Sequence, residues 1–152
     1  MAVKVESLLK ELDINVLIGV LSGRTTRAIN RELQRSFRAT GVKVTPDQWT
    51  ILLSLTKNNN VTQQSIADIT YRDKPNISRI AGILENKGLI KRSTDKSDKR
   101  NNIVTITAKG EEQVKAAHEA AIRTMQRALI GFTETDVLKL HKLLRTIFSN
   151  LA

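Results

Sequence analysis

The chain has 152 residues, and its 25 Lys and Arg against 15 Asp and Glu give a formal net charge of +10. This length predicts a single domain with a real core, and the absence of cysteine excludes disulfides and thiol redox sensing and fits a cytoplasmic address. No apolar run approaches the ~20 residues that cross a bilayer, so we expect no membrane span and, from the N-terminal pattern, no secretion signal.

The excess positive charge is concentrated in two segments. Residues 24–38 carry five basic residues and one acidic residue, and residues 72–100 carry nine basic and four acidic residues. Such clustering favours a surface directed at a polyanion over general solubilisation.

An unusually long helix is expected near the N-terminus. Leu8, Leu12 and Val16 recur every four residues. The apolar pattern continues more weakly until Gly41 and Pro46 end it. The first half of this helix is apolar around much of its circumference, and a lone domain of this size would struggle to cover that surface.

The same helix carries a basic series at steps of three and four residues. Its members are Arg24, Arg27, Arg31, Arg35 and Arg38. One interpretation is a solvated stripe. The other is contact with phosphate or the lining of a pocket for an acidic ligand, and the spacing does not decide between them.

Two short helices are predicted next, over residues 47–55 and 63–69, separated by an Asn-Asn-Asn break. The residues expected to be buried are Trp49, Leu52, Leu53, Ile66 and Ile69. Thr62 has the character of a helix cap, and we expect Thr62 and Gln63 to contact phosphate near this helix start.

Asp73 caps a third helix that ends at Gly88. Its inward-facing residues are Ile77, Ile80, Ala81 and Leu84, and its outward-facing residues are Lys74, Asn76, Ser78 and Arg79. Asn suits adenine and Arg suits guanine in bidentate hydrogen bonds, while Ser and Lys serve bases or phosphates. A solvated face is the alternative. This face has short polar side chains among its basic residues and few acidic residues, which favours DNA contact.

A basic hairpin follows this helix at once. The strand candidates are residues 89–93 and 102–107, joined by a loop that contains Lys96, Asp98, Lys99 and Arg100. We interpret Arg100 as a minor-groove residue, with Asp98 near enough to orient its guanidinium. The alternative is a flexible tip kept soluble by its charges. A recognition-like helix followed by a basic hairpin predicts a winged helix-turn-helix.

Two further helices complete the chain. Thr107 caps the first, whose apolar stripe is Val114, Ala117, Ala121, Met125 and Leu129. Thr133 and Asp136 form a capping-box-like start for the second. The apolar side of the second helix is formed by Val137, Leu140, Leu144, Ile147, Phe148 and Leu151.

Catalytic chemistry finds little support in the sequence. His118 and His141 lie on different predicted helices without a paired acidic cluster. No Gly-rich phosphate loop, zinc-ligand spacing or nucleophile turn appears. We therefore expect no enzyme, no metal and no cofactor.

Three motifs together resemble the MarR family of bacterial transcriptional regulators. They are ISRIAGILENKGLIKR at residues 77–92, DKR at residues 98–100 and VTITAKG at residues 104–110. They are similar to the family's recognition helix and its exit, its acid-x-Arg wing signature and its turn into the next helix. Pro75 departs from the family pattern, in which a hydroxyl residue is more frequent.

The resemblance covers the whole chain and implies a mainly α fold of six helices with a small β-wing. It implies one domain, with residues 46–108 as the winged helix-turn-helix lobe and residues 1–40 and 109–152 as dimerisation helices. The implied homodimer contacts are Leu8, Leu12, Val16, Leu140, Leu144, Ile147 and Phe148. It also implies two recognition helices about one DNA turn apart on a pseudo-palindromic operator.

We therefore expect a dimeric regulator of transcription, preferentially a repressor, that binds double-stranded DNA. The resemblance suggests relief by a small amphipathic or phenolic ligand between the dimer platform and the DNA-binding lobe. Two alternatives stay open, a nonspecific architectural DNA-binding protein and a winged-helix module that binds an acidic protein partner. The sequence does not identify the operator, the regulated genes or the effector.

Overall fold

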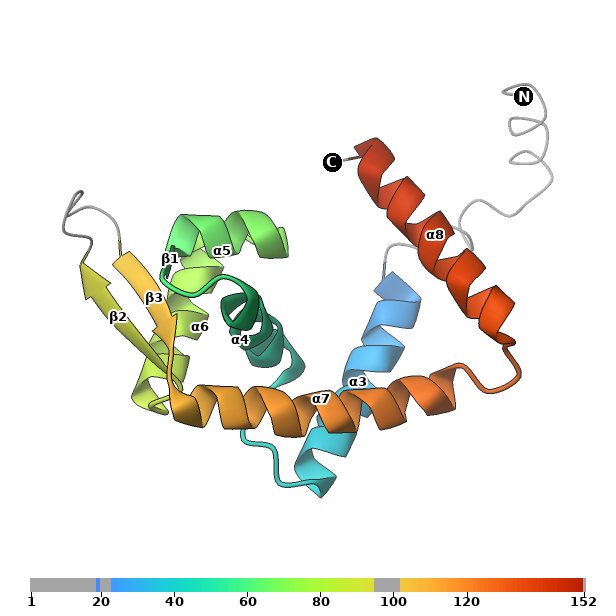
Figure 1. Cartoon of the computed structure of the whole chain (residues 1–152), viewed down its shortest axis with the longest axis horizontal. Coiled ribbons are helices and arrows are strands. Elements are labelled where there is room, and N and C mark those ends of the chain that lie inside the picture. The colour runs from blue at the N-terminus through green and yellow to red at the C-terminus, as the bar shows by residue number, and fades with distance from the viewer. Residues whose placement is uncertain (1–18, 20–22, 95–101, 152) are drawn as a thin grey trace.

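The computed structural model describes residues 19, 23–94 and 102–151 (Figure 1). Its elements are α3 (Thr25–Ala39), α4 (Pro46–Lys57), β1 (Val61–Thr62), α5 (Gln63–Thr70), α6 (Lys74–Asn86), β2 (Ile90–Thr94), β3 (Asn102–Ile106), α7 (Ala108–Ala128) and α8 (Glu134–Leu151). Six helices and one small sheet in the described ranges confirm the predicted mainly α fold with a β-wing. Of the long N-terminal helix, α3 is the described part.

The sheet has β3 as its central strand, paired antiparallel with β1 on one side and β2 on the other. β2 and β3 form the predicted hairpin, with Ile90 opposite Ile106. β1 places Val61 opposite Val104. The sequence did not predict β1, because a strand of two residues has no alternation to detect.

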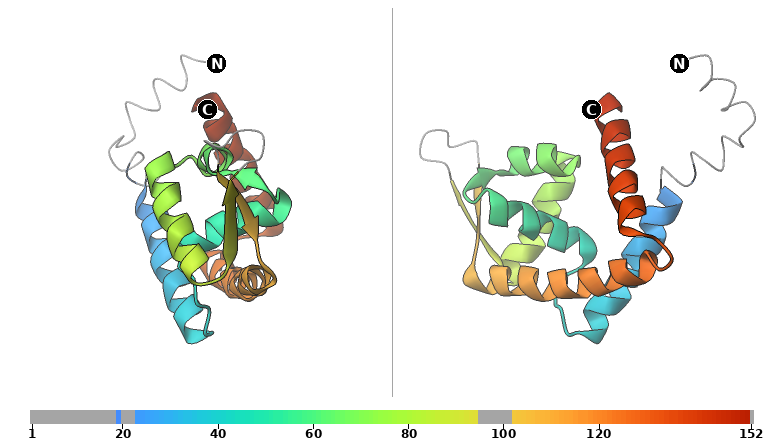
Figure 2. Two further views of the ribbon diagram at one scale, coloured as in Figure 1. Left: turned by 90° about the vertical axis from the view of Figure 1, so that its left-hand side faces the viewer. Right: turned by 45° about the vertical axis from the view of Figure 1, so that its right-hand side comes forward.

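The core lies where α4, α5 and α6 pack around the base of this sheet and against α3 and α7 (Figure 2). The largest side chains that are fully buried are Phe37, Ile51, Leu52, Leu55, Ile66, Ile77, Leu84, Leu89, Ile90 and Val104. Trp49 packs edge-on against Phe37, with ring centroids 5.8 Å apart. This core joins α3 and α7 to the lobe that carries α6 and the hairpin.

Side-chain caps fix the helix starts at the predicted residues. Thr62, Asp73 and Thr107 each accept a hydrogen bond from the backbone N–H three residues later, at 3.0, 2.7 and 3.1 Å. Thr133 Oγ1 accepts from the Asp136 N–H at 3.2 Å, and Asp136 Oδ2 accepts from the Thr133 N–H at 2.9 Å. The hydrogen bonds from Thr133 lower the pKa of Asp136 below its ordinary value.

Some residues predicted to be buried lie at the edge of the core. Ile69 is 49% exposed, so that prediction was wrong. The core face of α5 consists of Gln63, Ile66 and Ala67. At about 100° per residue, Ile69 lies more than a quarter turn around the helix from the centre of that face, so its side chain points away from the core. Trp49 is only partly buried.

α7 carries the chain from the hairpin to the other side of the molecule, where α8 rises away from the end of α7 at a steep angle (Figures 1 and 2). No residue of α8 is buried in the single chain. The side chain of Phe148 contacts Tyr71 edge-on, with ring centroids 4.8 Å apart. Within the described residues, no helix is both long and apolar enough to cross a membrane.

Candidate nucleic-acid interface

α6 separates its apolar and polar residues as the sequence predicts. Ile77, Ile80, Ala81 and Leu84 are buried, which confirms the predicted inward face. Lys74, Ser78 and Arg79 are exposed and Asn76 is half-buried. Arg79 Nη2 donates a hydrogen bond to Asn76 Oδ1 at 3.1 Å, so these two side chains lie together on the outer face.

The start of α5 holds Thr62 and Gln63, the two residues predicted to contact phosphate. Thr62 is half-buried, and its hydroxyl lies 2.9 Å from Ser65 Oγ while it caps the helix. The Gln63 side chain is only 5% exposed, because Gln63 shares the core face of α5 with Ile66 and Ala67. The phosphate contact at Thr62 and Gln63 stays a prediction, and the burial of the Gln63 side chain favours a contact through the backbone. A contact at this helix start would use backbone N–H groups.

The hairpin is attached to α6 by an ion pair between Glu85 and Arg92. Arg92 Nε donates to Glu85 Oε2 at 2.8 Å, and the Arg92 backbone N–H donates to Glu85 Oε1 at 3.2 Å. The side-chain hydrogen bond from Arg92 is the main reason that the pKa of Glu85 lies below its ordinary value of 4.5. This contact fixes the angle between the recognition-type helix and the wing. The predicted wing residues Lys96, Asp98, Lys99 and Arg100 lie outside the described residues.

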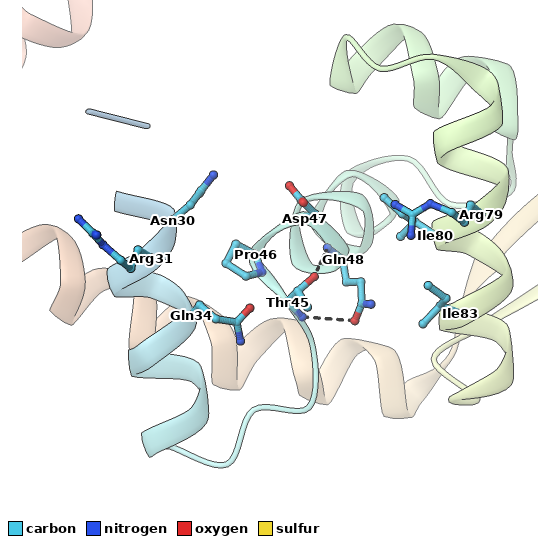
Figure 3. A pocket seen from close by; sticks show the side chains of 10 residues that line it. All are labelled: Asn30, Arg31, Gln34, Thr45, Pro46, Asp47, Gln48, Arg79, Ile80 and Ile83. Carbon is cyan, nitrogen blue, oxygen red and sulfur yellow. Dashed lines mark hydrogen bonds between the residues drawn. The ribbon is translucent and has the colours of Figure 1, made fainter. Parts of the chain in front are cut away.

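A pocket of about 450 Å³ lies between α3, the start of α4 and α6 (Figure 3). Its lining residues are Asn30, Arg31, Gln34, Thr45, Pro46, Asp47, Gln48, Arg79, Ile80 and Ile83. Arg79 points from α6 into this space, whereas Arg31 points outward from α3. The pocket thus joins Arg79, a residue of the candidate DNA face, to α3.

Asp47, on the α4 side of this pocket, is held by Arg72, whose Nη2 lies 2.6 Å from Asp47 Oδ1. Arg72 immediately precedes Asp73, the cap of α6. The ion pair therefore connects the wall of the pocket to the start of the candidate recognition helix.

The basic series of α3 has no single role in the structure. All five arginines are exposed. Arg31 lines the pocket beside α6, while Arg35 lies 3.5 Å from Glu32, which also pairs with Arg127 of α7 at 2.6 Å. Of the alternatives left open, the structure places Arg31 at a pocket and Arg35 in a surface ion-pair cluster.

Comparison with known proteins agrees with this geometry. A sequence profile of the MarR family matches residues 44–101. The repressor CouR of Rhodococcus jostii RHA1, solved on a 23-mer DNA duplex, is 27% identical, with 91% of this chain and 94% of CouR covered and a TM-score of 0.77. The transcriptional regulator SlyA is 25% identical over 92% of this chain and 94% of its own, with a TM-score of 0.76. Residues 44–101 of this chain thus match the MarR family.

The curated relatives that this chain matches are regulators of transcription. The repressor IacR of Pseudomonas putida is 25% identical over 129 residues, which are 85% of this chain and 74% of IacR. The regulator HosA of Escherichia coli is 27% identical over 74 residues, and that match spans about half of either protein. These relatives are regulators and not enzymes, as the sequence analysis predicted for this chain.

The resemblance implied a ligand site between the dimer platform and the DNA-binding lobe, but sequence reasoning did not identify the residues that line the pocket and missed the Asp47–Arg72 ion pair. Both combine residues from segments that are far apart in the chain, and each residue alone has an ordinary helical context. The basic series on α3 was the one available signal. It indicated an acidic ligand as an alternative without naming the partners on α4 and α6.

We expect Glu85→Gln to lower the free energy of unfolding at pH 7 by about 1 kcal/mol, because the variant keeps the shape of the side chain but loses the charged partner of Arg92. The pKa of Glu85 is lowered in the folded state, so its stabilisation is present above pH 4.5 and is lost as the pH falls through the folded pKa. Urea unfolding at pH 7 and pH 3 measures this. A difference between parent and variant that stayed constant over that range would contradict the assignment.

Proposed function

We propose that this MarR-family regulator binds a pseudo-palindromic operator as a homodimer and represses transcription from it. The observation that carries the proposal is the division of α6 into a buried apolar side and an exposed side with Lys74, Ser78 and Arg79. A helix of this kind fits the major groove, and the attached hairpin would bring Arg100 to the flanking minor groove. CouR, a relative of the same fold, is solved on a 23-mer DNA duplex, which supports double-stranded DNA as the partner.

The homodimer is supported by the surface of α8. Leu140, Leu144, Ile147 and Phe148 are 38–50% exposed, and they occupy one side of a helix that has no buried residue. An apolar surface of this kind is unfavourable in water unless another molecule covers it. Leu8, Leu12 and Val16, the other predicted contacts, lie outside the described residues. A second copy of the chain would bury both sets and hold two α6 helices one DNA turn apart.

Regulation by a small ligand is the second part of the proposal. The pocket between α3, α4 and α6 has an apolar wall at Pro46, Ile80 and Ile83 and a cation at Arg79. It therefore suits a small molecule with an apolar body and an anionic group. CouR is also solved with p-coumaroyl-CoA, and that structure is 21% identical to this chain, so it supports the fold and leaves the ligand here to experiment.

Selection of binding sites from a random duplex pool at ~150 mM salt tests the proposal, because this salt concentration suppresses nonspecific attraction. We expect an inverted repeat whose half-sites are about one turn apart, bound at least ~10³-fold more tightly than random duplex. Equal affinity for all duplexes would support the architectural DNA-binding protein instead. Failure to bind any duplex, together with binding to an acidic protein, would support the protein-interaction module.

Asn76→Ala should relax preference at particular base pairs of the selected operator and change overall affinity less. Loss of a bidentate contact to adenine costs about 1–3 kcal/mol of discrimination at that position. The measurement is a repeat of the site selection with the variant. Asn86→Ala makes the same change at the opposite end of α6 and should select the parental site. An unchanged consensus for Asn76→Ala would remove this residue from the base-reading set.

A further inference from the structure

Arg79 lies at the boundary between two faces of α6. At about 100° per residue, the order around the helix runs from Ser78 and Gly82 to Arg79 and then to Ile83 and Ile80. Ser78 belongs to the exposed face proposed for DNA, while Ile83 and Ile80 line the pocket. A long flexible side chain at this position can reach either side without a change in the backbone.

In this structure the Arg79 side chain is turned toward the pocket (Figure 3). Its guanidinium donates to Asn76 Oδ1, a neutral acceptor, at 3.1 Å. Asp47 is on the same pocket wall, but its carboxylate is taken up by Arg72 at 2.6 Å. Among the ion pairs of the described residues none includes Arg79, so its charge is available to an anion from outside the chain.

We propose that Arg79 is a shared group, which binds the DNA backbone or bases in one state and an anion held in the pocket in the other. The inference rests on the proposed function and adds the residue through which the pocket controls DNA binding. The Arg79 side chain cannot extend into the pocket and toward DNA at the same time, so occupancy of the pocket and contact with DNA compete directly for Arg79. This competition needs no change in the spacing of the two lobes of the dimer.

Both binding events draw on the same charge, so the effect is reciprocal by linkage. Operator DNA should weaken the binding of an anion in the pocket by the same factor by which the anion weakens the binding of the operator. A neutral ligand of the same shape would not attract the Arg79 guanidinium, so Arg79 would still contact DNA.

A carboxylate built into the pocket tests this without knowledge of the natural ligand. Ile83 lies one helical turn after Arg79 on the pocket side. A negative charge introduced at this position can pair with the Arg79 guanidinium. Ile83→Glu introduces that negative charge. Ile83→Gln is the matched control, since it loses the same apolar packing and adds no charge. The ratio of their dissociation constants for the selected operator is measured in the parent and in an Arg79→Gln background.

With Arg79 present, we expect Ile83→Glu to bind the operator roughly 10-fold or more weakly than Ile83→Gln, the size of one lost charge-assisted hydrogen bond. In the Arg79→Gln background the ratio should fall below about 3-fold, which is the part due to general repulsion between the carboxylate and DNA. Arg79→Gln alone should weaken operator binding by roughly 10-fold.

Equal ratios in the two backgrounds would overturn the inference, because the carboxylate would then act on DNA without Arg79. An Arg79→Gln variant with parental affinity would also overturn it, while leaving operator recognition to other residues. Failure of the proposed function looks different, since the parent itself would then select no operator. If the Ile83 variants do not fold, Asn30→Asp makes the same comparison from α3, with the natural Asn30 as the neutral control.

Discussion

Gly110→Ala should destabilise the chain by about 3 kcal/mol and lower its melting temperature by roughly 10 °C, which is at the upper end of overpacking effects. A Cβ at Gly110 would lie 2.2 Å from the backbone oxygen of Leu89 and 2.7 Å from Ile106 Cγ1. The Leu89 oxygen has no freedom to withdraw, because it accepts a hydrogen bond from the Thr107 N–H at 3.0 Å. The first turn of α7 and the entry to β2 would therefore have to separate.

Gly82→Ala is the matched control for this experiment. A Cβ at Gly82 meets no atom within 4 Å, and the position is inside a helix. Replacing a helix-interior glycine with alanine should raise stability by roughly 0.5–1 kcal/mol. Thermal unfolding of both variants at equal protein concentration gives the comparison, since the melting temperature of a dimer depends on concentration. Similar stabilities of the two variants would contradict the close approach at Gly110.

Leu144→Glu should convert the protein to a monomer and weaken operator binding by at least ~100-fold, because the second half-site contact is no longer intramolecular. Leu144 is 48% exposed in the single chain, on the apolar side of α8. A charge buried there by a second copy of the chain would have no partner and would cost several kcal/mol. Sedimentation equilibrium measures the oligomeric state, and titration of the selected operator measures affinity.

Thr146→Glu is the control on the same helix. It adds the same charge on the polar side of α8, beside Lys142 and Arg145, where the side chains are exposed. This variant should remain dimeric and bind DNA nearly as the parent does. A dimeric Leu144→Glu variant would show that α8 is not the interface. A monomeric variant with full affinity would show that DNA binding does not need the dimer.

Local signals in the sequence were sufficient for the helices and their starts. Thr62, Asp73 and Thr107 were predicted as caps because a short polar side chain before an apolar periodic segment accepts a backbone hydrogen bond, and each does so. The polar face of α6 was predicted in the same way, from the helical spacing of its apolar residues. These features depend on residues within one or two turns of each other, so the sequence carries them completely.

Predictions of burial were less secure at the edges of the elements. Ile69 was expected to be buried because it is apolar, but α5 has eight residues and its neighbours cover one side of it. Gln63 is polar, but it lies on the covered side of α5 and is buried. In both cases the packing partners decided burial, and residue type did not.

The sequence by itself determined the helices from α4 onward, the β2–β3 hairpin, the caps, the polar face of α6 and the resemblance to the MarR family, since each depends on neighbouring residues or on motifs in register. Only the tertiary structure decided which residues from separate segments meet. It paired Asp47 with Arg72, fixed the wing through Glu85 and Arg92, and turned Arg79 toward a pocket shared with α3 and α4. The physical reason is that such contacts are set by the packing of whole helices, and no local pattern of side chains encodes the distance between them.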